Sequence, residues 1–273
     1  MLPTIPRMSH SVATDSWKRP MSIANNCGGT LVGDKWVLTA RHCQMAVDRT
    51  IPPYYNNVIP LYAAGVRINN NGQFANIIPV EDIFICPDDK YPPNYNGTYP
   101  SGFKACVDCI LVKLQESALP YGAMAAPMYR GLKPFEHEVS IVGMGSYEES
   151  RVSNYLREYS TIVATDDNCQ PPQTKYGIYN STRSICAGRQ NEYKRSGMGD
   201  SGGPMFIYNE NNSRMEYLGT VNGGVPIHDG VERNFTRFVY SDYIADWVEQ
   251  TIRDNEATSA STSEAEIFQL ASS

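Results

Sequence analysis

A single serine stands in a run of residues with great conformational freedom. Residues 195–205 read RSGMGDSGGPM, in which Ser201 lies between Asp200 and two glycines. Glycine permits positive φ angles and close backbone approach, so such a loop can present one hydroxyl and aim backbone N–H groups at one point. A nucleophilic serine and the oxyanion that it creates need this arrangement. The same composition also suits a plain turn, so the assignment depends on a base and an acid.

The base must come from a small set, and His42 has the most informative surroundings. The histidines of the chain are His10, His42, His137 and His228. A β-rich run leads into His42, and Cys27 and Cys43 flank the segment. A disulfide between them would hold the histidine in a small loop and contribute about 3 kcal/mol in the loop-entropy picture. We predict that His42 is the catalytic base.

An imidazole base needs a buried carboxylate to orient it, and Asp108 is the candidate. It opens a strongly apolar run, since residues 106–114 read CVDCILVKL. A charge at that position must find a partner, because an unpaired buried charge is costly. The segment alone leaves open that Asp108 turns out to solvent.

The residues around Ser201 also match the G-x-S-x-G pattern of α/β-hydrolases. That fold needs the order serine, acid, histidine along the chain. Only His228 follows Ser201, and no alternating strand–helix pattern surrounds it. We therefore reject this alternative.

The elements that must position these residues are mostly strands. Short β-rich runs, broken by Gly, Pro and Asn, occupy residues 36–40, 107–114, 139–142, 158–164, 217–221 and 235–240. This spacing is typical of an all-β barrel or sandwich. A helix is predicted from residue 241 to about residue 254, because its apolar residues fall on one face. Residues 254–273 are small and polar, and we predict that they form a disordered tail.

Composition and charge exclude some functions and indicate a compartment. The net charge of −6 gives no reason to expect a nucleic-acid partner. No apolar run approaches the roughly 18 residues that span a membrane, so no membrane partner is expected. The N-terminus shows no signal peptide. Seven cysteines and four Asn-x-Ser/Thr sites nevertheless favour a secreted, disulfide-bonded glycoprotein. We predict no metal and no cofactor, because the one C-x-x-C pair has no second pair to complete a zinc site.

Three blocks carry a family resemblance. The segments CGGTLVGDKWVLTARHC (27–43), DCILVKL (108–114) and GMGDSGGP (197–204) occur in the order histidine, aspartate, serine. They resemble the catalytic blocks of the trypsin/chymotrypsin-like serine proteases, and the resemblance covers roughly residues 20–253. It implies an all-β fold of two six-stranded antiparallel β-barrels with a C-terminal helix, and an active site between the barrels.

The resemblance also implies roles. His42 is the general base and acid, Asp108 is its orienting carboxylate and Ser201 is the nucleophile. The N–H groups of Gly199 and Ser201 form the oxyanion hole, and catalysis runs through an acyl-enzyme. The implied partners are a protein or peptide substrate, an activating protease and protein inhibitors.

The pairing of the cysteines follows in part from the same resemblance. Family disulfides correspond to Cys27–Cys43 and Cys169–Cys186. We infer a third bond, Cys86–Cys106, as a local staple across a loop rich in Pro, Asn and Tyr. It would leave Cys109 as a free thiol in the core.

The N-terminus departs from the family pattern. Members usually begin the mature chain with Ile-Val-Gly-Gly, whose free amine pairs with the aspartate before the nucleophile, here Asp200. This chain has no such segment. Arg7 lies at about the right distance upstream, so we predict activation by cleavage after Arg7. Residues 1–19, which precede the protease domain, are then an N-terminal segment that represents the remnant of a processed propeptide.

The primary specificity pocket departs as well. The disulfide that usually braces it is absent, because its first position is Gly197, and its wall ends in Gly224. The residue at its base is Arg195, and Arg233 could also reach it. A cation there repels a basic side chain, so we predict no cleavage after Lys or Arg. We expect instead a preference for an acidic residue or a broad set.

These departures keep a second hypothesis open, a catalytically silent protease homologue that acts as a secreted binding module. Silent homologues typically lose a member of the triad, and none is lost here. An active serine endopeptidase is therefore the favoured prediction.

Overall fold

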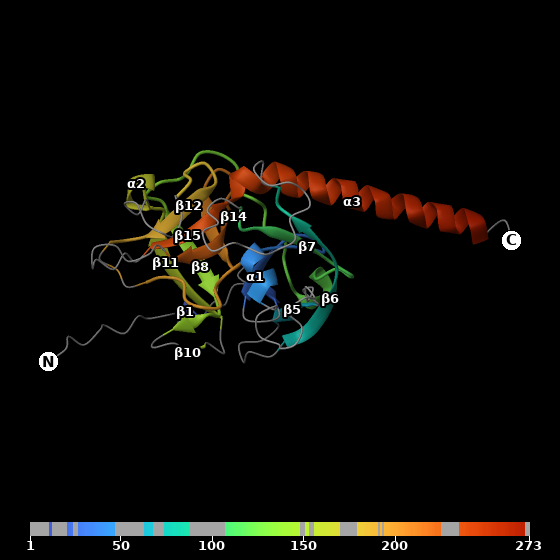
Figure 1. The fold of residues 1–273 in the computed structure, drawn as a ribbon, viewed down its shortest axis with the longest axis horizontal. Coiled ribbons are helices and arrows are strands. Elements are labelled where there is room, and N and C mark those ends of the chain that lie inside the picture. The colour runs from blue at the N-terminus through green and yellow to red at the C-terminus, as the bar shows by residue number, and fades with distance from the viewer. Residues whose placement is uncertain are drawn as a thin grey trace.

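Two β-structures lie side by side in the computed structural model, and a long helix projects from them (Figure 1). The structure describes residues 11–12, 21–23, 27–46, 63–67, 74–87, 107–147, 151–152, 156–169, 179–190, 192, 194–224 and 235–270. All statements below refer to these residues.

The first β-structure is a closed barrel with the strand order β2-β3-β4-β7-β6-β5. Its strands are β2 (Met21–Ile23), β3 (Cys27–Gly33), β4 (Trp36–Thr39), β5 (Ala63–Arg67), β6 (Phe74–Ile85) and β7 (Ile110–Leu114). Strand β4 is buried on both faces: Val37 packs inside the barrel, whereas Trp36 and Leu38 pack toward the second β-structure and the C-terminal helix. Burial on both faces explains why its sequence, like that of β7, is mostly apolar, with Thr39 and Lys113 as the buried polar exceptions.

The second β-structure is a seven-stranded antiparallel sheet with the order β1-β11-β8-β13-β14-β15-β12. Its strands are β1 (Ser11–Val12), β8 (Glu138–Gly143), β11 (Arg157–Ile162), β12 (Ser184–Gly188), β13 (Pro204–Asn209), β14 (Arg214–Gly224) and β15 (Phe235–Tyr240). An isolated bridge between Val163 and Ala187 joins the end of β11 to β12, so the sheet curls onto itself. The predicted two-barrel fold is confirmed, and the N-terminal segment adds β1 as an extra strand.

Short elements complete the described chain and connect the strands. They are α1 (Arg41–Ala46), the 3₁₀ turn η3 (Leu119–Tyr121), β9 (Ser146–Tyr147), β10 (Arg151–Val152) and α2 (Asp166–Cys169). Strands β9 and β10 pair with each other as a small ribbon. Helix α1 matters most for function, because it follows β4 directly and carries His42.

The C-terminal helix α3 spans Ser241–Leu270, which corrects the predicted end near residue 254 and the predicted disordered tail. No Gly or Pro occurs after Ser241, so the sequence holds no residue that would stop the helix. The expected apolar face is confirmed, because Ile244 and Val248 are buried in the core between the two β-structures. Trp36 Nε1 donates to Glu256, 3.1 Å away, which extends the docked part of the helix beyond residue 254. Among the described helices, none has the length and apolarity that crossing a membrane requires.

Candidate active site

The predicted base and acid meet in the structure. His42 Nδ1 lies 2.5 Å from Asp108 Oδ2, and the backbone N–H of His42 donates to Asp108 Oδ1 over 2.7 Å. Asp108 therefore accepts two hydrogen bonds from one residue, which fixes both the position and the ring orientation of the histidine. The Nδ1 atom is the donor, so in the neutral imidazole Nε2 is left as the proton acceptor.

Asp108 is placed by the strand that follows it. Val107 and Cys109 on either side are buried, and the side chain of Asp108 is only 18% exposed. Asp108 therefore does not turn out to solvent, the reading that the sequence left open. Its charge is satisfied by His42, as a buried carboxylate requires.

The pKa of His42 is raised above its ordinary value of 6.5. Burial alone would lower this pKa, but the hydrogen bond to Asp108 and the negative charge of Asp108 outweigh that effect. Asp108 thus stabilises the imidazolium form. A base of this kind takes up a proton more readily than a free histidine.

The loop of residues 195–203, which we call the nucleophile loop, carries Ser201 and connects the second sheet to the first barrel. The carbonyl of Ser201 accepts the N–H of Gly28 over 2.7 Å, and Gly28 lies on β3. Gly202 has a φ of +79°, and a side chain there would come within 2.9 Å of the backbone N of Ala40. The Cys27–Cys43 disulfide links β3 to α1 beside this contact. The loop is thereby seated against the segment that holds His42.

Two N–H groups of this loop have no acceptor among the described residues. The N–H groups of residues 196, 197, 198, 200, 202 and 203 all donate to groups in the chain. Those of Gly199 and Ser201 donate to no described residue, and Gly199 has a φ of +94°. Unused N–H donors beside a serine hydroxyl are what an oxyanion hole provides.

Asp200 is held by a cage of backbone N–H groups. Its Oδ1 accepts the N–H of Gly145 and its Oδ2 that of Gly197, each over 2.7 Å. Burial raises the pKa of Asp200 above 3.8, and these hydrogen bonds, with one from Met144, lower it in part. A side chain at Gly143 would come within 2.8 Å of the carboxyl carbon, and one at Gly145 within 2.6 Å. Both positions therefore need glycine.

The residues predicted for the specificity pocket are only partly described. Arg195 is exposed, and Gly224 ends β14 with open space where a side chain would be. Arg233 lies outside the described residues. The assignment of these residues to a pocket stays a prediction.

The cysteine predictions fare differently from one another. The structure forms both Cys27–Cys43 and Cys169–Cys186. Cys109 is a buried thiol, and burial raises its pKa well above the ordinary value. Cys106 lies outside the described residues, so its bond to Cys86 stays a prediction.

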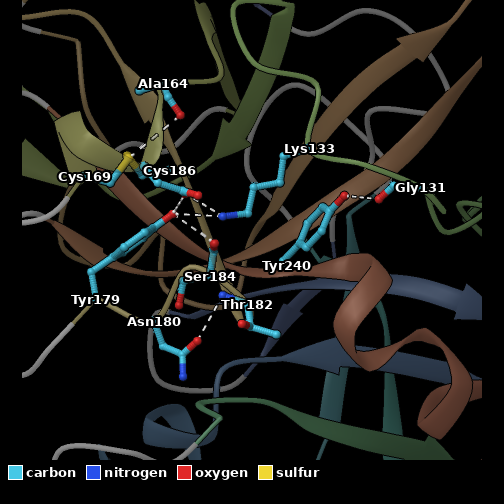
Figure 2. A network of polar contacts seen from close by, with 11 residues as sticks. Gly131, Lys133, Ala164, Cys169, Tyr179, Asn180, Thr182, Ser184, Cys186 and Tyr240 are labelled. Carbon is cyan, nitrogen blue, oxygen red and sulfur yellow. Dashed lines mark hydrogen bonds and ion pairs between the residues drawn. A yellow bond between two sulfur atoms is a disulfide. The ribbon is translucent and has the colours of Figure 1, made fainter.

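A polar network supports the second disulfide (Figure 2). Lys133 Nζ lies 2.5 Å from Asp166 Oδ1, and the hydroxyl of Tyr179 lies 2.7 Å from the same oxygen. The Tyr179 hydroxyl is also 2.9 Å from the carbonyl of Ser184, two residues before Cys186. This network fixes the disulfide segment on the sheet.

Some residues that shape the site gave no functional signal in the sequence. Ser146, Tyr159 and Thr236 contact the nucleophile loop, although each lies far from it along the chain. The glycines of VSIVGMG, residues 139–145, could not be linked to Asp200 without the fold. Only an alignment of many relatives could have indicated such contacts beforehand.

The fold and the site define the class of a two-barrel serine hydrolase, and comparisons with known proteins agree. The sequence model of the family described as Trypsin matches residues 7–248. Granzyme E of Mus musculus is 31% identical over 208 residues, which cover 73% of this chain and 73% of the relative. Granzyme F of Mus musculus is 32% identical over 68% of this chain and 67% of the relative. Cathepsin G of Mus musculus is 29% identical over 73% of this chain and 68% of the relative. The chain belongs to the trypsin family, and it is a serine endopeptidase.

The raised pKa of His42 predicts the acid limb of the pH profile. The base acts only when neutral, and a raised pKa keeps it protonated to higher pH. We expect kcat/KM to fall as the pH drops, with a midpoint above 6.5. The measurement is kcat/KM against pH with an uncharged peptide substrate. A midpoint clearly below 6.5 would contradict the role of Asp108 in stabilising the imidazolium.

Proposed function

We propose that this endopeptidase hydrolyses peptide bonds in proteins through Ser201, His42 and Asp108. The observation that carries the proposal is the pairing of His42 with Asp108 over 2.5 Å, beside a serine loop with two unused N–H donors. A base, an orienting acid, a nucleophile and an oxyanion site are the parts that acyl transfer needs.

The proposed reaction follows from the roles of these atoms. Ser201 Oγ attacks the carbonyl carbon while His42 Nε2 takes the hydroxyl proton. The carbonyl oxygen becomes an oxyanion and accepts the N–H groups of Gly199 and Ser201. His42 then gives its proton to the leaving amine, and an acyl-enzyme remains. Water, deprotonated by His42, attacks the ester to form a second tetrahedral intermediate. The bond from the acyl carbon to Ser201 Oγ then breaks, His42 returns the proton to Oγ, and the acid product leaves.

The alternative is a silent homologue that only binds its partners. Such a protein needs neither an oriented base nor unused N–H donors beside a serine. In such a protein the pairing of His42 with Asp108 would serve no reaction. Burying the charge of Asp108 costs free energy, so the pairing favours a catalytic role. We therefore favour the active enzyme.

Removing the nucleophile or the acid tests the mechanism. Ser201→Ala should lower kcat by about 10⁶-fold, and Asp108→Asn by about 10⁴-fold, because the latter leaves the imidazole in the wrong tautomer. The measurement is steady-state hydrolysis of a peptide amide, with labelling by a fluorophosphonate to count active serines. Unchanged hydrolysis by Ser201→Ala would refute the assignment, and absence of any labelling in the otherwise unchanged chain, both at full length and after cleavage following Arg7, would favour the binding module.

We further propose that cleavage after Lys or Arg is excluded. Arg195 stands six residues before the nucleophile, where a positive charge repels a basic substrate side chain. We expect the ratio of kcat/KM for an uncharged or acidic residue before the scissile bond to that for Arg to exceed about tenfold. A peptide library measures this ratio, and Arg195→Asp should reduce it. Efficient cleavage after Arg by the wild type would contradict the exclusion, and an unchanged profile in Arg195→Asp would separate Arg195 from the pocket.

We also propose that cleavage after Arg7 activates the enzyme. Val12 pairs with Arg157, which pairs with Gly143 beside Asp200. Two strand spacings separate Val12 from Gly143 by roughly 10 Å. The chain from Met8 to Val12 can span roughly 14 Å. The ammonium of Met8 could therefore reach Asp200. Burial still raises the pKa of Asp200 despite its amide cage, so a cation would stabilise the ionised carboxylate.

A direct comparison of two chains tests the activation. A chain beginning at Met8 should exceed the full-length chain in kcat/KM by about 10²-fold or more, the usual effect of an incomplete oxyanion hole. Arg7→Gln in the full-length chain should resist activation by a trypsin-like protease and serves as the control. Equal activity of the two chains, with the intact N-terminus shown by mass spectrometry, would refute it.

We propose that the enzyme is secreted and acts on extracellular proteins. The two disulfides support this, because such bonds persist mainly in oxidising compartments. Asn180 and Asn211, each in an Asn-x-Ser/Thr site, are exposed and would accept glycans there. An activating protease and protein inhibitors are the further partners that this function implies.

A further inference from the structure

The nucleophile loop must be held in one conformation although two of its N–H groups have no acceptor among the residues that the structure describes. Asp200 fixes the loop from within, through its hydrogen bonds with Gly145 and Gly197. The residues before Gly199 need support from outside the loop. In the family pattern the disulfide that braces the specificity pocket starts within this loop, and Gly197 occupies its first position here.

On one side, the loop is attached to Ser146. The N–H of Met198 donates to Ser146 Oγ over 2.9 Å, and the N–H of Ser146 donates to the carbonyl of Met198 over 2.6 Å. Gly197 lies so close that an added Cβ would be 2.6 Å from Ser146 Oγ. A cysteine at residue 197 would not fit, so the glycine belongs to a different means of support.

On the other side, the loop is attached to β15 and β11. The N–H of Ser196 donates to Thr236 Oγ1 over 3.0 Å, and Thr236 is 1% exposed. The hydroxyl of Tyr159 lies 3.3 Å from Ser196 Oγ and 3.4 Å from Thr236 Oγ1. Burial raises the pKa of Tyr159 to about 12, so its hydroxyl keeps its proton near neutral pH. The Tyr159 hydroxyl is therefore available as a hydrogen-bond donor to Ser196 or Thr236.

We propose that Ser146, Tyr159 and Thr236 form a hydroxyl clamp that positions the nucleophile loop in place of a disulfide. The clamp grips residues 196–198 from both sides and so fixes the peptide that presents the N–H of Gly199. Its members are positioning residues and do not touch the reacting atoms. The inference rests on the proposed function, because it concerns how that same site is kept ready.

The test compares two threonines that differ in their partners. Thr236→Val keeps the side-chain shape but removes the acceptor of the Ser196 N–H. We expect kcat to fall by about 10- to 100-fold, the usual effect of leaving a buried donor unpaired. KM should change less than kcat, and the pH midpoint set by His42 should stay in place. Thr161→Val is the matched control, because Thr161 is 3% exposed and its hydroxyl has no partner among the described residues.

Two further variants separate the clamp from a general loss of structure. Thr236→Ser restores the hydroxyl and should recover kcat to within a few-fold of wild type. Ser146→Ala, on the opposite side of the loop, should lower kcat in the same way. If Thr236→Val does not fold, Ser146→Ala and Thr236→Ser still decide the matter. The clamp is overturned if Thr236→Val behaves like Thr161→Val, or if Thr236→Ser is as impaired as Thr236→Val.

Amide hydrogen exchange gives a readout that does not depend on activity. Exchange at residues 196–198 should be faster in Thr236→Val and in Ser146→Ala than in wild type, and unchanged in Thr161→Val. If Ser201→Ala abolishes hydrolysis while Thr236→Val alters neither kcat nor exchange, the clamp is wrong and the proteolytic function stands. If the wild type neither hydrolyses peptides nor labels at Ser201, the proposed function fails, and exchange still decides whether the clamp holds the loop.

Discussion

The contact between the nucleophile loop and strand β3 is the constraint on which the rest of the site depends. The Gly28 N–H and the Ser201 carbonyl join the two β-structures at the point of chemistry. An added Cβ at Gly28 would be 2.7 Å from the Cα of Gly203, so this approach is possible only without a side chain. The Cys27–Cys43 disulfide and the core shared by both β-structures hold the same junction. The segments that carry Ser201 and His42 are therefore both attached to strand β3.

The polar groups of the site show how this rigidity is used. The loop satisfies its backbone donors within the protein except at Gly199 and Ser201, among the described residues. Unsatisfied donors are normally avoided because each one lowers stability. Here they are kept beside the nucleophile, where a developing negative charge can use them without rearrangement. The site thus gives up some stability for preorganisation, and the many contacts around the loop offset that loss.

Two buried carboxylates follow different solutions to the same problem. Asp108 meets the imidazole and the backbone N–H of His42, which leaves His42 Nε2 as the proton acceptor. Asp200 meets only backbone N–H groups in the described structure, and its pKa remains raised. A charge satisfied by neutral donors responds to any cation that approaches. The first carboxylate is paired with an imidazole, and the second is held by backbone N–H groups of Gly145 and Gly197.

The sequence by itself determined the fold class, the family and the two family disulfides, and it predicted the triad, because all of these depend on short motifs in a fixed order. It indicated the start and the apolar face of α3, but not its end, since no residue there marks a stop. Only the tertiary structure decided which groups support the nucleophile loop. Ser196 and Thr236 are 40 residues apart, and Met198 and Ser146 are 52 apart. A serine or threonine in a strand has no local feature that names its partner, so such contacts exist only once the sheets have packed.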